Sequence, residues 1–379
     1  MGPAWTMMAA LKLMLLGLVL AAGPLAWVWL RHSNQLTHRL KALTLLTLFL
    51  TFDLVLFGAF TRLTDSGLGC PDWPGCYNQA TPLAARQNIL AAQAELPSGP
   101  VTPVKAWIEM IHRYLATAVG VLILVMAIES WRIYIKHRFF RPWWATLTLL
   151  WVCVQGAFGA LTVTMKLFPA IVTLHLLGGL ALLGLLTRQA VSLHVQAGTD
   201  STQDLGSTSP ASTVAPDFVA PRLAVWALVL LVIQINLGGW VSTNYAVLAC
   251  TEFPMCQNSW WPEMNFVQGF EVWRELGMTG AGEHISFAAL TAIHMVHRWV
   301  AVGVFGVLAV LAYTWWRQPE QRLWARVLLG LMGLQFFTGL SNVVLGWPLI
   351  SAVLHTGGAA ALVMVLVAAM TLQTSKRIL

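Results

Sequence analysis

Long apolar segments, separated by polar loops, make up most of the chain. Each segment holds about twenty residues, enough for a helix to cross a hydrocarbon core of roughly 30 Å. The segments are too long for barrel strands and lack the alternation of polar and apolar positions that such strands show. The pattern predicts an all-α integral membrane protein with about nine transmembrane helices, at 8–30, 40–60, 108–130, 143–164, 170–190, 222–243, 287–313, 323–345 and 349–371.

Basic residues gather in alternate loops, which orients these helices in the membrane. The net charge is +7, but the basic side chains are scattered among short loops and form no single patch of the kind that binds nucleic acid. Lys and Arg favour cytoplasmic loops. We therefore expect the N-terminus and the loops 61–106 and 244–286 outside, and the C-terminus in the cytoplasm. The basic positions are Arg31, Arg39, Lys41, Arg132, Lys136, Arg138, Arg141, Arg317, Arg322, Arg326, Lys376 and Arg377.

The first apolar segment has two interpretations. The small residues of "VLAAGPLA" resemble a signal-peptide cleavage site. Removal of the segment would place every basic loop outside, against the usual charge bias, so we expect it to be retained as a transmembrane helix. The N-terminus lacks the Arg-rich and Ser-rich pattern of a mitochondrial transit peptide, which favours a bacterial plasma (inner) membrane.

The chain matches itself at an offset of 180 residues. "GAFTRLTDSGLGCPDWPGC" from Gly58 corresponds to "GGWVSTNYAVLACTEFPMC" from Gly238, and "QGAFGALTV" from Gln155 corresponds to "QFFTGLSNV" from Gln335. "TLHLLGG" and "LHTGG" match around two further histidines, and "EMIHR" matches "HMVHR" at an offset of 185. The matches predict two four-helix bundles. An even number of spans separates equivalent points, so the two are parallel repeats.

The repeat divides the chain into four regions. An extra N-terminal transmembrane helix with a cytoplasmic loop occupies 1–39, and the N-terminal four-helix half occupies 40–193. The segment 194–221 is rich in Ser, Thr, Pro and Gly, which predicts a flexible cytoplasmic linker. The C-terminal four-helix half occupies 222–379.

Four of the five intramembrane histidines belong to the repeat: His112, His175, His297 and His355. All four lie in the outer half of the membrane at a similar depth, which is what two imidazoles on facing helices need to hold a haem between them. Polar groups are costly in hydrocarbon, so four packing histidines at one depth are the less favoured alternative. Zinc or copper is disfavoured as well, because no carboxylate-rich or thiolate cluster shares this depth.

Charged residues beside these histidines differ between the halves. Glu109 lies three residues before His112 on nearly the same helix face, whereas its counterpart is His294. An intramembrane carboxylate is costly enough that a functional role is the default, so the favoured interpretation is one haem with an acid/base beside it. The alternative is that Glu109 is an interfacial residue, because it lies close to the outer end of its helix. Arg113 and Arg298 directly follow the histidines and are candidates for binding haem propionates, with interfacial snorkelling as the alternative.

Cysteines occur as two C-x5-C pairs in the outer loops, Cys70 with Cys76 and Cys250 with Cys256. The outer compartment permits disulfides. A structural clip that shapes a lid is favoured over a redox-active disulfide for both pairs, more strongly for the second. Cys153 stands alone in a helix and is expected to pack in the core.

Together these motifs resemble the heme A synthase family of bacterial and mitochondrial membranes, from about Leu40 to the C-terminus. The resemblance rests on the first outer loop, on "EMIHR", "TLHLLGG", "HMVHR" and "LHTGG". It implies oxidation of the C8 methyl group of heme O to a formyl group by successive hydroxylations with oxygen from water. It further implies a substrate haem between His112 and His175, and a haem b that carries electrons between His297 and His355.

The resemblance also assigns roles outside iron ligation. Glu109 matches the family's catalytic carboxylate, and Cys70 with Cys76 matches its first-loop cysteine pair. Heme O synthase and terminal oxidase assembly factors become candidate partners, and small intramembrane residues such as Gly178 and Gly358 allow close packing around a haem or in a homo-oligomer. The alternative functions are a non-enzymatic di-haem b electron carrier and a haem transporter or assembly chaperone.

Overall fold

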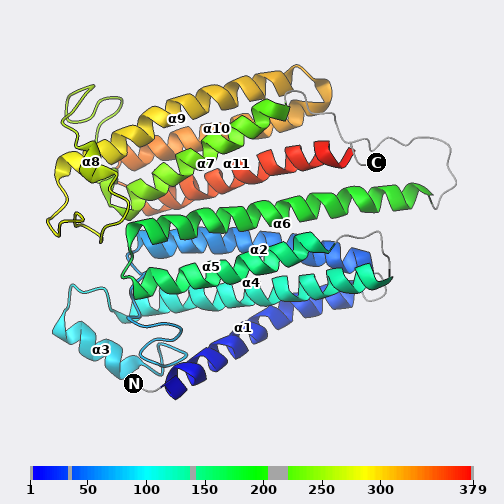
Figure 1. Cartoon of the computed structure of the whole chain (residues 1–379), viewed down its shortest axis with the longest axis horizontal. Helices are drawn as coiled ribbons and strands as arrows, with labels where there is room; N and C mark the ends of the chain where they lie inside the picture. Colours follow the sequence, from blue (N-terminus) through cyan, green and yellow to red (C-terminus); the bar gives the residue numbers. More distant parts are fainter. Residues whose placement is uncertain (1–2, 33–35, 137–141, 204–220, 377–379) are drawn as a thin grey trace.

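The computed structural model describes residues 3–32, 36–136, 142–203 and 221–376. Within these ranges nine helices are long and apolar enough to cross a membrane, and they run side by side along the long axis (Figure 1). This confirms the all-α membrane fold and the number of spans. The long helices are α1 (Pro3–Arg31), α2 (Leu36–Leu63), α4 (Pro103–Lys136), α5 (Trp143–Thr164), α6 (Pro169–Gln203), α7 (Pro221–Thr243), α9 (Phe287–Trp316), α10 (Arg322–Val344) and α11 (Leu349–Lys376).

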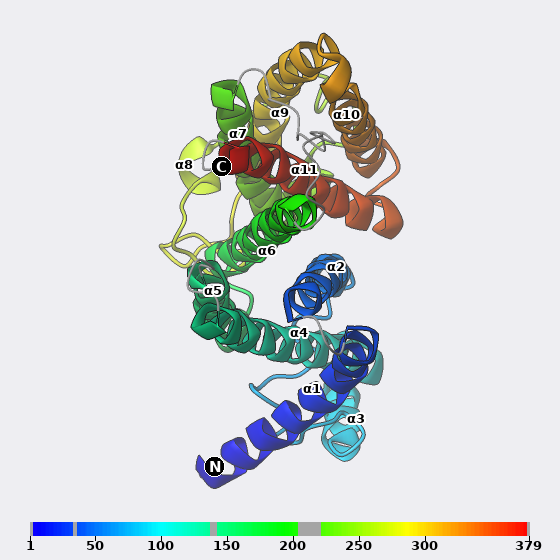
Figure 2. The same cartoon turned by 90° about the vertical axis from the view of Figure 1, so that its right-hand side faces the viewer.

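Two closed rings of four helices carry the fold (Figure 2). In the N-terminal half α2 contacts α4, α4 contacts α5, α5 contacts α6, and α6 returns to α2. In the C-terminal half α7, α9, α10 and α11 close in the same order. The halves meet where α6 contacts both α7 and α11 and where α11 contacts α2. Because equivalent helices make equivalent contacts, the arrangement agrees with the predicted parallel repeat.

Helix α1 stands outside both rings and packs along α4. Ala21 and Val28 of α1 are buried. A Cβ on Gly17 would lie only 2.4 Å from Cγ2 of Thr117, so only glycine permits this approach of the two helices. The extra helix is thus a packed part of the protein in this structure.

Both cysteine-containing loops lie at the same end of the molecule as the N-terminus, and the C-terminus lies at the other end (Figure 1). The loops carry the short helices α3 (Arg86–Glu95), η1 (Ala246–Ala249) and α8 (Phe266–Gly269), and η2 (Pro319–Gln321) lies in a loop at the opposite end. This shared side agrees with the predicted topology. We call the end that carries the cysteine loops the outer end, and which end faces the cytoplasm stays a prediction from the positive-inside rule.

Two details differ from the sequence-based expectations. Cys153 is exposed on α5, so the expected core packing is wrong. The physical reason is that lipid is as apolar as a protein core, so an apolar side chain in a membrane helix need not face inward. Helix α6 continues to Gln203, past the predicted start of the linker, and no proline interrupts the sequence before Pro210. Residues 204–220 of that linker lie outside the described residues.

Candidate haem-binding and catalytic site

Each of the four repeated histidines rests against a glycine of a neighbouring helix. A Cβ on Gly58 of α2 would lie 3.1 Å from Cε1 of His112, and a Cβ on Gly238 of α7 would lie 3.0 Å from Cε1 of His297. For Gly159 on α5 and Gly339 on α10, the corresponding distances to His175 and His355 are 3.5 and 3.2 Å. The absence of a side chain at these four positions therefore makes room for the imidazole rings.

The paired histidines face each other across their bundles. His112 is on α4 and His175 on α6, which are opposite members of the first ring of helices, and His297 on α9 and His355 on α11 are opposite members of the second. Within each pair the two imidazoles are electrostatic neighbours. The structure thus brings together the two predicted pairs, one in each half.

The surroundings of the ring nitrogen Nδ1 differ between the two halves. In the C-terminal half Nδ1 of His355 lies 2.9 Å from Oγ1 of Thr338, and Nδ1 of His297 lies 3.0 Å from Nε2 of Gln234. In the N-terminal half Nδ1 of both histidines is buried and finds no hydrogen-bond partner among the described protein groups. Opposed imidazoles over glycine cradles fit a haem held edge-on between two helices.

Two glutamines, which the sequence reasoning did not single out, support these histidine helices. Nε2 of Gln335 on α10 donates to the carbonyl of His355 at 2.8 Å, and a Cβ on Gly358 would lie 2.2 Å from the same nitrogen. The counterparts repeat the arrangement, since a Cβ on Gly178 would lie 1.8 Å from Nε2 of Gln155. The repeated glutamine and glycine at fixed spacing from the histidine are the sequence signal that could have identified this contact.

Glu109 is buried at the outer end of α4 and has two partners. Its Oε2 accepts a hydrogen bond from the backbone N–H of Cys70 at 2.7 Å, and its Oε1 forms an ion pair with Nη2 of Arg113 one turn further along the helix. Only 4% of Glu109 is exposed. The carboxylate therefore joins the helix that carries His112 to the first cysteine loop.

The two arginines hold the outer loops in place. Nη1 of Arg113 donates to the carbonyls of Asp72, Pro74 and Gly75, at 2.6 Å for the last. Arg298 donates to the carbonyls of Met255 and Cys250 at 3.1 and 3.2 Å. Sequence reasoning missed this loop-holding role. Propionate binding by the two arginines stays a prediction.

The C-terminal half has no carboxylate at the position of Glu109. Its counterpart His294 is buried, and Nδ1 of His294 lies 3.0 Å from the carbonyl oxygen of Ala246 in η1. The ring thus holds a loop of its own half. Of the two sites, only the N-terminal one has a buried acidic group on the turn next to its histidine.

Both predicted disulfides form, Cys70 with Cys76 and Cys250 with Cys256. All four cysteines are buried. In the first loop the carboxylate of Asp72 accepts from the backbone N–H groups of Tyr77 and Asn78, both at 2.6 Å, and Glu252 accepts from Asn258 in the second. Each disulfide thus closes a tight loop at the outer end of its bundle, as the clip interpretation predicts.

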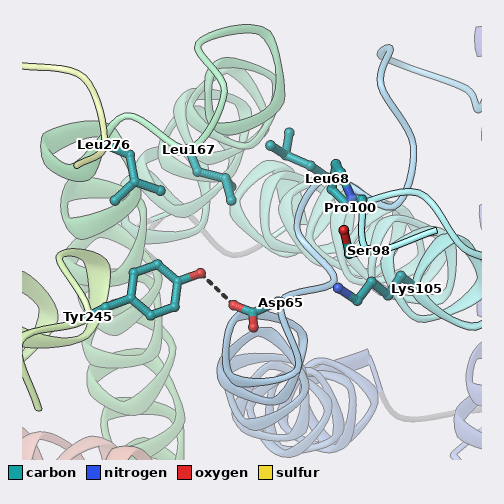
Figure 3. Close-up of a pocket in the computed structure, with 9 residues that line it drawn as sticks. Asp65, Leu68, Ser98, Pro100, Lys105, Leu167, Tyr245 and Leu276 are labelled. Atoms are coloured by element: carbon teal, nitrogen blue, oxygen red, sulfur yellow. Dashed lines mark hydrogen bonds between the residues drawn. The ribbon is translucent and has the colours of Figure 1, made fainter. Parts of the chain in front are cut away.

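A cavity of about 270 Å³ opens at the outer end of the N-terminal half, where it meets the C-terminal half (Figure 3). The O–H of Tyr245 donates to Asp65 at 2.5 Å, and Arg62 donates to Tyr245 and to the carbonyl of Ser242 at 2.8 and 2.7 Å. Lys105 at the start of α4 also lines the cavity. Asp65 and Tyr245 are counterparts in the repeat, as are Arg62 and Ser242, so this cluster lies where the two halves meet on the outer side.

Among the described residues, no group of three or more His, Cys, Asp or Glu side chains is placed to hold a metal ion. Each of the two sites therefore offers two histidines as protein ligands. Further ligands of a bound iron would come from the macrocycle itself.

Comparison with known proteins assigns the chain to a family. The model of the cytochrome oxidase assembly protein family (COX15-CtaA) matches residues 41–367. A heme A synthase of Shewanella oneidensis is 38% identical over 343 residues, which cover 88% of this chain and 95% of that protein. A heme A synthase of Halalkalibacterium halodurans is 27% identical over 304 residues, covering 79% and 85%. The chain therefore belongs to the cytochrome oxidase assembly protein family, together with these heme A synthases.

Proposed function

We propose that this protein is a heme A synthase, an oxidoreductase that converts the C8 methyl group of heme O to a formyl group. The observation that carries the proposal is the pair of histidine sites on glycine cradles, of which only the N-terminal one has a buried carboxylate beside it. Family membership supports the same reaction. The N-terminal pair His112 and His175 is the substrate site in this proposal.

Glu109 is the proposed base of the N-terminal site. Conversion of a methyl to a formyl group removes protons at each oxidation step and adds oxygen from water, so a proton acceptor near the reacting carbon is required. Glu109 lies one turn from His112 on the outer side. Arg113 and the N–H of Cys70 stabilise its ionised form and hold its orientation.

The C-terminal pair His297 and His355 would hold the haem b. When bound, such a haem supplies one-electron redox chemistry. Thr338 holds the ring of His355, Gln335 donates to the carbonyl of the same residue, and Gln234 donates to the carbonyl of His297. Contacts of α6 with α7 and α11 keep the two halves in register.

The outer cavity is the proposed route for water to the N-terminal site. It lies at the outer ends of α2 and α4 and is bounded by both halves. Asp65, Lys105 and Tyr245 make its lining partly polar (Figure 3). Heme O synthase as donor of the insoluble substrate, terminal oxidase assembly factors and a homo-oligomer stay predictions.

The test is expression of this chain with a heme O synthase in a host that makes no heme A, followed by mass analysis of the extracted haems. The expected result is a species with the mass of the formyl product. Glu109→Gln should lower its amount by about 100-fold or more, the range for loss of a general base. Glu129→Gln is the matched control, because Glu129 is a second buried carboxylate on α4 that pairs with Arg132 at the opposite end.

Two results would contradict the proposal. Full formyl product from a Glu109→Gln variant that still binds both haems would remove the role of Glu109. Recovery of only haem B and heme O from a folded wild-type protein, with both histidine pairs occupied, would favour the di-haem b electron carrier instead.

A further inference from the structure

The two halves differ in what holds their histidine rings. Oγ1 of Thr338 donates its own proton to the carbonyl of Leu334 at 2.6 Å and lies 2.9 Å from Nδ1 of His355. Because the hydroxyl proton is used, the oxygen accepts from the N–H at Nδ1. The ring of His355 is thereby fixed in the tautomer that leaves Nε2 free to coordinate iron.

The other ring of the C-terminal half has a polar partner as well. The side-chain amide of Gln234 on α7 lies 3.0 Å from Nδ1 of His297 and donates to the backbone carbonyl of the same residue at 3.1 Å. The same amide nitrogen also lies 3.4 Å from Nε2 of His297, so Gln234 anchors this residue through its carbonyl and does not fix the tautomer of the ring. Of these two contacts, the one from Thr338 fixes a ring so that its Nε2 is left free.

The N-terminal half lacks both partners for a reason that the sequence makes explicit. At the repeat offset of 180, Leu54 takes the place of Gln234 and Phe158 takes the place of Thr338. Neither side chain offers a hydrogen-bond acceptor. Nδ1 of His112 and of His175 is accordingly buried without a partner among the described protein groups. The glycine contacts, by contrast, are kept in both halves.

A hydrogen bond at Nδ1 changes how an imidazole binds iron. It orients the ring, raises the basicity of the ligating nitrogen and favours the ferric state, and loss of such a partner typically lowers metal affinity about 10- to 100-fold. A resident electron carrier needs a firmly bound haem, whereas a substrate site must take up one haem and release another.

We propose that Thr338 is a positioning residue that makes the C-terminal site retain its haem, and that Phe158, at the equivalent position of the repeat, leaves the N-terminal pair as exchangeable ligands. The two halves use the same pair of histidine ligands. The hydrogen bond at Nδ1 is then what distinguishes the cofactor site from the substrate site. The inference rests on the proposed function for which site exchanges its haem and which retains it. The difference in residues between the two halves does not depend on the reaction.

The experiment measures haem release from the full chain, purified in detergent and loaded with haem B, to an excess of a soluble apoglobin. The variants His112→Ala/His175→Ala and His297→Ala/His355→Ala each keep one pair and so assign the kinetic phases. The expected result is a release from the N-terminal pair at least tenfold faster than from the C-terminal pair.

Substitution at Thr338 separates positioning from mere packing. Thr338→Val keeps the shape and removes the acceptor, so release from the C-terminal pair should become about 10- to 100-fold faster. Its midpoint potential should rise, by 59 mV for each tenfold change in ferric over ferrous affinity. Thr338→Ser keeps the hydroxyl and should match the wild type in both readouts, and Phe158→Thr should slow release from the N-terminal pair.

Equal release from the two pairs in the wild type would overturn the inference, as would a Thr338→Val variant with unchanged release and potential. Thr338→Ala, which also removes the acceptor, applies the same test if the valine variant does not fold. Because haem B release is read instead of product, unequal release without any formyl product would reject the proposed function and leave this inference standing.

Discussion

The imidazole of His112 lies so close to Gly58 that a Cβ on the glycine would be 3.1 Å from Cε1. Gly58→Ala should therefore push the ring out of place and lower the haem content of the N-terminal half, with a cost of about 1 to 3 kcal/mol for overpacking. Gly238→Ala should do the same in the C-terminal half, where the distance is 3.0 Å. Haem-to-protein ratios of the single-pair variants measure both effects.

The control for these substitutions is Gly120→Ala on α4, where a Cβ would meet nothing within 4 Å. This variant should keep both haems. Equal haem content in Gly58→Ala and Gly120→Ala would show that the glycine cradle is not required.

A second prediction concerns Gly358, whose missing side chain leaves room for Gln335. Gly358→Ala would place a Cβ 2.2 Å from Nε2 of Gln335, so either the helices separate or the glutamine leaves the carbonyl of His355. We expect a lower unfolding temperature and a weaker C-terminal haem site. Gly358→Ala/Gln335→Ala should recover part of the unfolding temperature but not the haem affinity. A double variant no more stable than Gly358→Ala alone would argue against this contact.

Arg113 should matter more for stability than Arg298. Arg113→Ala leaves a buried carboxylate and three loop carbonyls without their partner, a loss of about 3 to 5 kcal/mol for a broken buried ion pair. Arg298→Ala removes hydrogen bonds to two carbonyls but strands no charge, and should cost less. Chemical unfolding in detergent, followed by Trp fluorescence, gives the comparison.

Arg132→Ala serves as the reference, because 64% of the Arg132 side chain is accessible and the buried Glu129 still has Arg39 at 4.0 Å. It should change the unfolding free energy by no more than about 1 kcal/mol. Similar losses for Arg113→Ala and Arg132→Ala would contradict the role given to the buried pair.

We predict that the protein loses folding stability at alkaline pH, where the phenol of Tyr245 loses its proton. Burial raises the pKa of Tyr245 above its ordinary value of 10.0, and Asp65 raises it further, while Arg62 lowers it. The folded state then holds the phenol proton more tightly than the unfolded state. The stability from this proton is fully present below pH 10 and is lost as the pH rises through the higher folded value.

The measurement is the unfolding temperature between pH 8 and roughly pH 11 for wild type and Tyr245→Phe. At neutral pH the variant should be less stable by about 1 kcal/mol, because a hydrogen bond to Asp65 is lost. Above pH 10 the difference should shrink. A constant difference across the range would exclude a titrating Tyr245 at the junction of the halves.

The predicted spans and histidine pairs were accessible from sequence for a simple reason. The length of an apolar segment is enough to identify a membrane helix. Each histidine motif occurs twice in the repeated sequence, which identifies His112, His175, His297 and His355 as one set. Nine membrane-spanning helices among the described residues and the histidine pairs across each bundle agree with this. Cys153 shows the limit, because apolar character does not say which face of a membrane helix meets lipid.

The sequence by itself determined the membrane class, the two repeated halves and the residue types available for chemistry, because these depend on composition and spacing along one chain. The tertiary structure decided which groups meet. Only packing across helices shows that Gly58 supports His112, that Arg113 joins Glu109 to the first loop, and that Thr338 reaches His355. Such contacts join separate helices or loops, and their partners follow from how the helices pack, which hydrophobic length does not encode.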